Sequence, residues 1–422
     1  MTTIAEVAIV GAGPYGLSIA AHLSARGLKP LIFGSPMKSW RDAMPRGMRL
    51  KSEGFASSLS DPDGRLTLKA FCESEKLPYA DINLPVPVET FVAYGDAFQR
   101  RFVPQLDTRM VGQIRKAPHG FTLRLDDGAE VDARKVIVAT GILSFRQVPE
   151  VLQGLSRERL SHTCEHADYS SFAGQRVVVI GAGASATDAA AALLQAGASV
   201  TLVCRSPSLT FYAGGSARGW LDSLIAPMTP IGPGWKKLLC VKAPLLFRML
   251  PERLRTMIVQ RFLGPAPCWF VREEIEGRVT VMGGSRIIDA RETAHGVKLE
   301  IASGGGTRTL EADHVIAGTG FRVNAARLQF LDTAIASALE LTQDAPRLSS
   351  NFESTVAGLH FVGTMAVYEF GPMLRFVCGA DFTARRVANH IAGAARPVTR
   401  KAEDYRSLEM SPARQRLPLE LE

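Results

Sequence analysis

A pattern of apolar strand, glycine-rich turn, helix and second apolar strand occurs twice in this chain, and it constrains the fold more than any other feature. The first copy joins the apolar run 7–10 to the turn 11–16, then to a helical stretch, 17–27, and to a second apolar run, 30–33. A glycine turn at this position lets a pyrophosphate approach the backbone, where the free N–H groups and the dipole of the helix favour negative charge. The first copy therefore predicts a dinucleotide-binding unit.

The second copy repeats this order over residues 177–204. Its turn, 181–186, has Ala186 where the first copy has a third glycine, which is a common small-residue variant. Each copy also closes in the same way, with an alternating strand, a hairpin turn and a strand that ends in Thr-Gly. These ends are Thr140-Gly141 and Thr319-Gly320. Agreement between signals so far apart predicts an α/β fold with two Rossmann-like dinucleotide-binding domains.

Two dinucleotide-binding units in one chain suggest a flavin in one and a nicotinamide in the other, with electrons passing between them. The second strand of such a unit often ends in an acidic residue that binds a ribose. The first copy has Ser35 near this position and no acid, so the serine or backbone groups must do that work. The second copy has Arg205 and Ser206, which suit the 2′-phosphate of NADP, although a solvated surface arginine is the alternative interpretation.

The composition excludes several classes of protein. The 422 residues suffice for two or three packed domains, and no apolar run approaches the length of a membrane-spanning helix. The net charge of +8 is not gathered in a dense basic stretch, so we expect no nucleic-acid partner. The six cysteines are far apart in the sequence, which leaves no CxxC pair and no standard zinc spacing, and we expect no metal. Isolated cysteines and the lack of a targeting pattern at the N-terminus predict a cytoplasmic protein.

These features resemble those of the class B flavin-dependent monooxygenases, which include flavin-containing monooxygenases, Baeyer–Villiger monooxygenases and the lysine and ornithine N-hydroxylases. The resemblance covers nearly the whole chain. The segments most similar to the N-hydroxylase branch are 40–52, 59–71, 85–94 and 313–321, with Gly318 and Phe321 in place of the usual Ala and Tyr. No substrate-binding residue of the amino-acid hydroxylases is recognised.

The resemblance implies FAD at the first turn and NADPH at the second. The FAD-binding residues are then Gly11, Gly13, Pro14, Tyr15, Gly16, Ser35, Trp40, Thr140, Gly141, Gly363, Pro372, Met373 and Leu374. The NADPH-binding residues are then His162, Gly181, Gly183, Ala184, Ser185, Ala186, Arg205, Ser206, Thr319 and Gly320. Lys51 and Arg49 are the candidate catalytic residues near the flavin ring, with surface cations as the alternative interpretation.

The expected organisation is an FAD domain made of residues 1–160 and 323–422, with an NADPH domain, 161–322, inserted between them. A helical insertion at about 206–275 is rich in Pro, Trp and basic residues. We expect it to form a lid or entry wall for an apolar or aromatic substrate. A solvated basic face is the alternative, and peripheral contact with a membrane surface is less favoured than either.

The implied activity is that of a monooxygenase. Hydride passes from NADPH to FAD, O2 forms a C4a-peroxyflavin, and one oxygen atom is transferred to a small organic substrate. N- or S-oxygenation or N-hydroxylation is favoured over Baeyer–Villiger oxidation. Two alternatives stay open: a reductase that passes electrons to a ferredoxin or quinone, and a flavin-binding redox sensor. The oligomeric state, including a homo-oligomer, also stays open.

Overall fold

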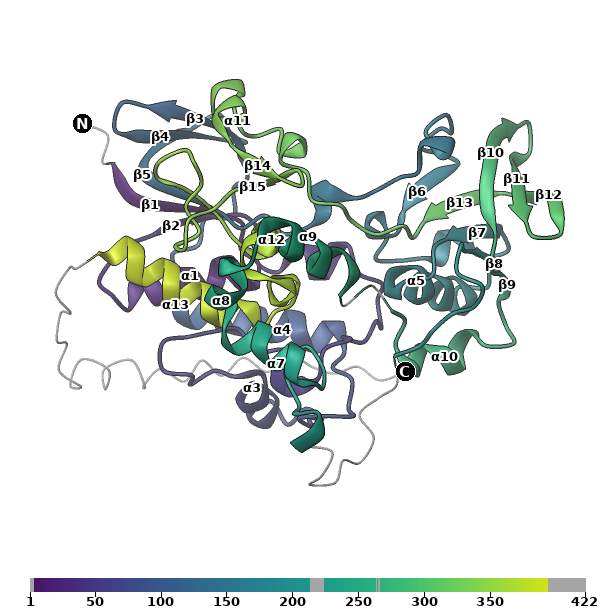
Figure 1. Cartoon of the computed structure of the whole chain (residues 1–422), viewed down its shortest axis with the longest axis horizontal. Coiled ribbons are helices and arrows are strands. Elements are labelled where there is room, and N and C mark those ends of the chain that lie inside the picture. Colours follow the sequence, from purple (N-terminus) through teal and green to yellow (C-terminus); the bar gives the residue numbers. More distant parts are fainter. Residues whose placement is uncertain (1–3, 213–223, 263, 265, 394–422) are drawn as a thin grey trace, which may run out of the picture.

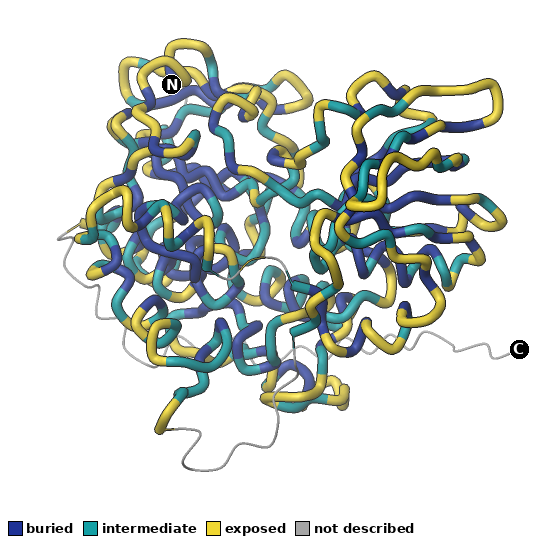
Figure 2. The backbone as a smooth tube through the Cα atoms, turned by 45° about the vertical axis from the view of Figure 1, so that its right-hand side comes forward, coloured by how far each residue is buried: buried dark blue, intermediate teal, exposed yellow. Residues whose placement is uncertain are grey.

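The computed structural model describes residues 4–212, 224–262, 264 and 266–393. Two α/β domains lie side by side (Figure 1). Each domain has its own buried core. In Figure 2 the buried residues, in dark blue, gather in two separate regions. Within the described residues, no helix combines the length and the apolar character needed to cross a membrane.

The first domain is built on a six-stranded sheet in the order β2-β1-β5-β4-β3, with β16 paired to β5. The strands are β1 (Ala5–Val10), β2 (Leu31–Phe33), β3 (Val111–Ala117), β4 (Gly120–Leu125), β5 (Glu130–Val138) and β16 (Leu359–Phe361). The strand β5 joins the antiparallel and the parallel parts of this one sheet. Its first half pairs with β4 in antiparallel fashion, and its second half lies between β1 and β16 in parallel fashion. The parallel part therefore consists of segments from both ends of the chain.

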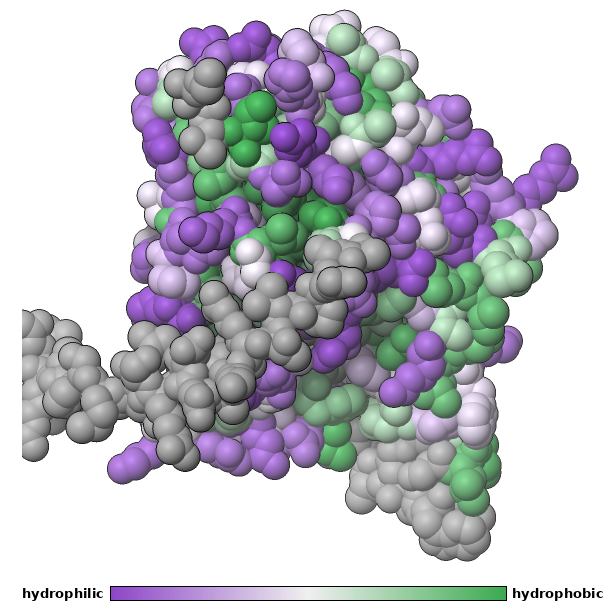
Figure 3. All heavy atoms as spheres, turned by 90° about the vertical axis from the view of Figure 1, so that its left-hand side faces the viewer, coloured by the Kyte–Doolittle hydropathy of each residue, from purple (hydrophilic) through white to green (hydrophobic). Residues whose placement is uncertain are grey.

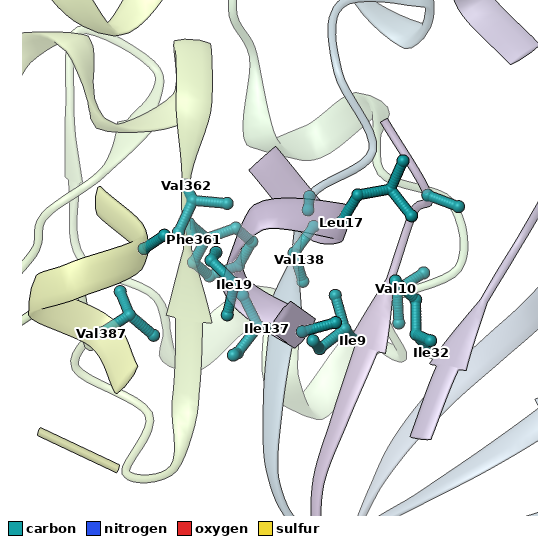
Figure 4. Close-up of a cluster of buried hydrophobic side chains, with 14 of the residues drawn as sticks. Ile9, Val10, Leu17, Ile19, Ile32, Ile137, Val138, Phe361, Val362 and Val387 are labelled. Carbon is teal, nitrogen blue, oxygen red and sulfur yellow. The ribbon is translucent and has the colours of Figure 1, made fainter. Parts of the chain in front are cut away.

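The first domain also contains the helices α1 (Pro14–Ser24), α2 (Lys38–Asp42), α3 (Leu68–Ser74), α4 (Val88–Phe102), α11 (Thr333–Ala338), α12 (Val367–Phe370) and α13 (Gly379–Ala392), with a small hairpin of β14 (Leu341–Thr342) and β15 (Ala345–Pro346). Helices α1, α4 and α13 pack together beside the parallel part of the sheet, and α11 contacts the antiparallel strand β3. The four residues 7–10 of β1 are at most 5% exposed, as expected for a parallel strand buried on both sides. Side chains of α1 and α13, including Ile19 and Val387, point toward those of β1, β5 and β16 (Figure 4).

The second domain has a five-stranded parallel sheet in the order β6-β13-β7-β8-β9 and a separate antiparallel sheet, β10-β11-β12. The parallel strands are β6 (Leu160–His162), β7 (Arg176–Ile180), β8 (Ser199–Val203), β9 (Thr280–Met282) and β13 (His314–Ala317). The antiparallel strands are β10 (Arg286–Thr293), β11 (Gly296–Ser303) and β12 (Gly306–Ala312). Helix α5 (Ala184–Gln195) follows β7, and α10 (Trp269–Ile275) packs against α5. The expected fold class, two Rossmann-like α/β domains, is confirmed.

Two connecting segments of the chain run side by side between the domains. Arg146 and Phe321 form an antiparallel bridge there. Beyond this bridge, Leu152 and Leu155 are buried in the core of the second domain, although residues up to 160 were expected in the first. We therefore propose that the first crossing lies near residue 148.

The helical insertion, expected at about 206–275, divides between the domains: α10 packs against α5 of the second domain, and the three helices described before it do not. Its helices α7 (Trp235–Lys242), α8 (Pro244–Met249) and α9 (Glu252–Arg261) lie against the first domain. Phe247 and Val259 are buried with Val367 of α12, and the buried Arg255 pairs with the buried Glu369. Because a buried charge is stable only when it is paired, this contact ties the insertion to the first domain. These three helices thus leave the second domain and cover the first.

Candidate dinucleotide and catalytic sites

The first glycine turn is shaped by two close backbone approaches. Gly11 has a φ of +112°, and a Cβ there would lie 2.4 Å from the carbonyl oxygen of Ala139. A Cβ on Gly16 would lie 1.9 Å from the carbonyl oxygen of Gly11. Gly13, at the start of α1, has nothing within 4 Å of its Cβ position. The turn is therefore closed on its inner side and open where a phosphate would approach.

This turn opens onto a cavity of about 430 Å³ at the carboxyl ends of β1, β2, β5 and β16. Ten of the thirteen predicted FAD residues line it: Gly11, Gly13, Pro14, Tyr15, Ser35, Trp40, Thr140, Gly141, Gly363 and Leu374. Gly16 lies behind the turn. Pro372 and Met373 are buried and do not line this cavity, whereas the lining begins at the next residue. The residues that follow them, Leu374–Val377, form the wall.

Tyr15 connects the turn to this wall. Its hydroxyl group donates to the carbonyl oxygen of Phe376 at 2.8 Å and lies 3.1 Å from that of Leu374. Burial raises the pKa of Tyr15 well above its ordinary value, so the hydroxyl group stays a donor. A segment near the C-terminus is in this way held against the helix that begins at the first turn.

Several residues of the cavity carried no sequence signal. Among them are Met37, Met110 and Phe330. Met110 and Phe330 come from segments with no local motif, and only the antiparallel sheet brings them to the cavity. Such contacts depend on long-range pairing and cannot be recognised in a single sequence.

The second glycine turn also brings helix and strand close together, but here the close contact is between Gly318 and Ala186. Gly181 has a φ of +141°, and a Cβ there would lie 2.2 Å from the carbonyl oxygen of Gly318. A Cβ on Gly318 would lie only 2.7 Å from the Cβ of Ala186. Ala186 fits because residue 318 is glycine. The two departures from the usual pattern, at 186 and 318, therefore compensate each other.

A cavity of about 740 Å³ begins at this turn. Eight of the ten predicted NADPH residues line it: Gly181, Gly183, Ala184, Ser185, Arg205, Ser206, Thr319 and Gly320. Ala186 packs beneath the turn against Gly318. Arg286, at the start of β10, also lines the cavity and was missed. It lies far from Arg205 in sequence, and only the position of the antiparallel sheet brings both guanidinium groups to one cavity.

His162 does not line this cavity, and its contact with NADPH stays a prediction. Its Nδ1 accepts a hydrogen bond from the backbone N–H of Cys164, and its Nε2 lies 3.2 Å from the carbonyl oxygen of Gly320. Its ring packs edge-on against Phe321. Burial lowers its pKa, which favours the neutral ring. His162 positions Gly320, and Gly320 lines the cavity.

Arg49 and Lys51, the candidate catalytic residues, join the two domains. Arg49 pairs with Glu274 of α10, and its guanidinium group lies 4.5 Å from the centre of the Phe270 ring. The Nζ atom of Lys51 donates to the carbonyl oxygen of Ala266 at 2.7 Å. In the described part of the chain, neither side chain lines the first cavity. These contacts support a role in holding the domains together, and the predicted catalytic role of the two residues stays a prediction.

Asp188 lies close to this interdomain contact. Burial and the neighbouring charge of Glu274 raise its pKa to about 7, and Lys51 and Arg49 act in the opposite direction. The carboxyl group is therefore half-protonated near neutral pH, in the first turns of the helix that follows the second glycine turn.

Comparison with known proteins adds three findings. A family model described as pyridine nucleotide-disulphide oxidoreductase matches residues 8–218. Indole-3-pyruvate monooxygenase YUCCA1 of Oryza sativa subsp. japonica is 30% identical over 214 residues, which are 49% of this chain and 49% of that protein. A ferredoxin–NADP reductase of Acidiphilium cryptum is 31% identical over 140 residues, which are 30% of this chain and 41% of that protein. The chain spans about half the length of the curated relatives it matches.

Among solved structures, ornithine hydroxylase PvdA from Pseudomonas aeruginosa is similar with a TM-score of 0.74 and 16% identity, over 92% of this chain and 99% of that one. At this identity the likeness shows a shared fold. It extends the similarity from the matched half to nearly the whole chain. The six cysteines are all free in the structure, so a disulfide centre is not part of the likeness.

Proposed function

We propose, from the premise that this chain belongs to the pyridine nucleotide-disulphide oxidoreductase family, that it is an FAD- and NADPH-dependent monooxygenase. The observation that carries the proposal is the pair of large cavities, each beginning at a glycine turn between a parallel strand and a helix. The printed activities of its monooxygenase relatives, and the fold shared with an ornithine hydroxylase, support the reaction class. The sequence resemblance to class B flavin-dependent monooxygenases agrees with both.

The residues of the first cavity fit FAD. Gly13 leaves open space at the start of α1, where free N–H groups would receive the pyrophosphate. Trp40, Met44 and Phe330 supply apolar wall on which a flavin ring can rest. Bound there, FAD would accept hydride from NADPH and activate O2, so that one oxygen atom is transferred to a substrate. The residues of the chain must bind and orient the cofactor and the substrate, and they must keep water away from the reacting atoms.

The second cavity fits NADPH. The start of α5 offers the same pyrophosphate site as the start of α1. Arg205 and Arg286 line the cavity from two different sheets and offer guanidinium groups for the 2′-phosphate. We propose that this pair sets the preference for NADPH over NADH. The role of Arg205 that the sequence suggested is thereby shared between two residues.

We propose that the substrate is apolar or aromatic and is received by the helical insertion. Helices α7–α9 enclose a largely apolar groove of about 510 Å³, whose lining includes Leu239, Leu246 and Phe262. Arg375 donates to the carbonyl oxygen of Val259 in α9 at 2.7 Å and also lines the first cavity. Arg375 therefore links the wall of the proposed flavin cavity to α9, the helix that contributes Met257 and Ile258 to the groove. Nitrogen or sulfur oxygenation remains the favoured chemistry from the resemblance.

The exposed surface around the groove supports this assignment. Met249 is 80% exposed and Leu239 is 58% exposed. Soluble proteins rarely expose neighbouring apolar side chains unless the patch binds something. Apolar side chains also gather in patches on the face of the molecule shown in Figure 3. An apolar entrance bordered by basic side chains such as Lys236 and Arg261 favours an apolar ligand with a polar or anionic end.

A reductase that passes electrons to a ferredoxin or quinone is the second candidate, favoured by the match to a ferredoxin–NADP reductase. Steady-state oxidation of NADPH separates the two. The monooxygenase predicts slow NADPH oxidation in air that rises when apolar amines, sulfides or indoles are added, with an oxygenated product by mass spectrometry. Rapid turnover with ferredoxin or quinones and no oxygenated product would assign the reductase instead. Turnover with neither would favour a flavin-binding sensor.

A further inference from the structure

Three side chains of the first domain, Glu353, His360 and His390, converge on one point away from the two glycine turns. Each offers one ligand atom, and these atoms all lie within 4.8 Å of one another. His360 belongs to β16, His390 to the last turn of α13, and Glu353 to the segment that leads into β16. None of them takes part in the proposed monooxygenase reaction.

The backbone places Glu353 directly opposite His360. The two residues form an antiparallel bridge. The flanking hydrogen bonds run from Ser354 N–H to the carbonyl oxygen of Leu359 and from Phe361 N–H to that of Phe352. This makes 353 and 360 a pair without mutual backbone hydrogen bonds, the arrangement in which opposing side chains lie closest. His390 joins from α13, with its Nε2 at 3.7 Å from Oε2 of Glu353.

Gly358 orients two of the three ligand atoms. Its N–H donates to Oε1 of Glu353 at 2.7 Å, which leaves Oε2 free to bind an ion. Its carbonyl oxygen lies 3.3 Å from Nδ1 of His360. When Nδ1 donates there, the lone pair of His360 is on Nε2. A histidine that binds a metal generally donates its other ring N–H to a carbonyl or carboxylate in this manner.

The Nε2 atom of His360 is otherwise unexplained. The side chain is 0% exposed, and this nitrogen has no hydrogen-bond partner among the described residues. A buried acceptor without a hydrogen bond is unfavourable, so native structures seldom leave one without compensation. A cation between the three side chains would satisfy the lone pair, together with the free oxygen of Glu353.

We propose that Glu353, His360 and His390 form a binding site for a divalent transition-metal ion. Two imidazoles and a carboxylate, with water in the remaining position, suit Zn²⁺, and the same donor set suits Fe²⁺. Tetrahedral ligand atoms around Zn²⁺ lie roughly 3.3 Å apart, so small side-chain movements would close the site. The absence of a standard zinc spacing predicted no metal, but that test cannot detect ligands brought together by a hairpin and a distant helix.

The site bears on the proposed flavin cavity through β16. This strand runs from His360 directly into Val362 and Gly363, which line the cavity. An ion that joins β16 to α13 would hold that edge of the cavity in place. It would act as a structural brace and not in the reaction, and its existence does not depend on the proposed function.

Metal binding by the full chain tests the site. The purified protein is treated with chelator, dialysed, and titrated with Zn²⁺ in one arm and with Fe²⁺ under argon in the other, with metal content measured by mass spectrometry. The wild type is expected to retain one ion per chain. Glu353→Gln and His390→Ala are expected to weaken binding at least tenfold. His295→Ala removes an exposed histidine of the β10–β11 hairpin and is expected to change nothing.

Thermal unfolding gives a second readout that does not require enzyme activity. The unfolding midpoint of the wild type should rise with added metal, because a ligand that binds only the folded state stabilises it, while the two variants should not respond. Both variants change partly exposed residues, so they avoid the folding risk of replacing buried His360. Less than a fifth of an ion per chain, or equal binding by wild type and both variants, would overturn the proposal. Tight binding in only one arm supports the site and identifies the ion.

Discussion

The two glycine turns have the same architecture but resolve the contact between helix and sheet with opposite choices of residue. In the first turn the helix contributes Gly16 and the closing strand contributes Ala139. In the second the helix contributes Ala186 and the closing strand contributes Gly318. A Cβ on Gly318 would lie 2.7 Å from that of Ala186, so one of the two must be glycine. In the second turn the third position is therefore coupled to residue 318, whereas in the first turn Gly16 is required by the carbonyl oxygen of Gly11.

A second difference lies in the helices. When Gly11 is matched with Gly181, Ser18 matches Asp188. Ser18 is fully buried, donates to the carbonyl oxygen of Pro14, and accepts the N–H of Ser60. Asp188 instead faces the contact between the domains, beside Glu274, Arg49 and Lys51. The polar contacts of Ser18 in the first helix thus stay within its own domain. Asp188 of the second helix instead lies near charged side chains of the first domain.

The largest effect is expected for Gly16→Ala. Its Cβ would lie 1.9 Å from a backbone oxygen, and neither strand nor turn can yield without opening the cavity. We expect destabilisation of about 4 kcal/mol or more and loss of bound flavin. Flavin content and urea unfolding measure both. Gly13→Ala is the matched control, since its Cβ meets open space. It should weaken flavin binding while the unfolding free energy without flavin changes by about 1 kcal/mol or less.

Gly318→Ala should destabilise the second domain by about 1–3 kcal/mol through overpacking against Ala186. Adding Ala186→Gly recreates the arrangement of the first turn and should recover most of this loss. Urea unfolding of both single variants and the double variant gives the coupling energy. Strictly additive effects would show that the two positions do not compensate each other.

Asp188, which matches Ser18 of the first helix, predicts that the free energy of unfolding depends on pH through the second helix and not through the first. The folded-state pKa of Asp188, about 7, is above its unfolded value, so the folded protein holds its proton more tightly. The contribution of Asp188 to the free energy of unfolding should therefore fall as pH rises from about 4 to 7 and level off above that range, which is measured as the difference between wild type and Asp188→Asn at each pH. Asp188→Asn should flatten this part of the profile. If wild type and variant follow parallel profiles, the carboxyl group titrates normally.

The smallest effect concerns the two arginines of the second cavity. Arg205→Ala and Arg286→Ala should each raise the Kd of NADPH about tenfold, which corresponds to 1.4 kcal/mol. NADH lacks the 2′-phosphate and serves as the internal control, because its Kd should change little. An equal loss for both nucleotides would mean that these side chains shape the cavity without reading the phosphate.

The order of strands, turns and helices was predictable because apolar runs and glycine turns are local signals. The inserted helices were not. Their basic and apolar residues indicated a lid, but the choice of domain depends on the buried pair of Arg255 and Glu369, which no local pattern reveals. The contacts of His162, whose two ring nitrogens lie against backbone groups, could not be predicted from its place ahead of the second turn.

The candidate site divides in the same way. Residues within the turns, such as Gly13 and Gly183, were recognised from spacing. Arg286 and Phe330 reach their cavities through antiparallel sheets, whose pairing is set by the whole fold. For Arg49 and Lys51 the sequence did not reveal the contacts between the domains. Their segment resembles one that lies along the flavin, but their side chains turn toward the second domain.

The most direct test of the central claim follows the flavin after oxygen is admitted. The protein is reduced with NADPH without air, mixed with O2 in a stopped-flow spectrophotometer, and monitored from 350 to 500 nm. The proposed monooxygenase predicts a species, distinct from oxidised and reduced flavin, that persists with NADP⁺ bound and decays faster when an apolar nucleophilic substrate is present. Immediate return to oxidised flavin without such a species, at a rate unaffected by substrate, would contradict it.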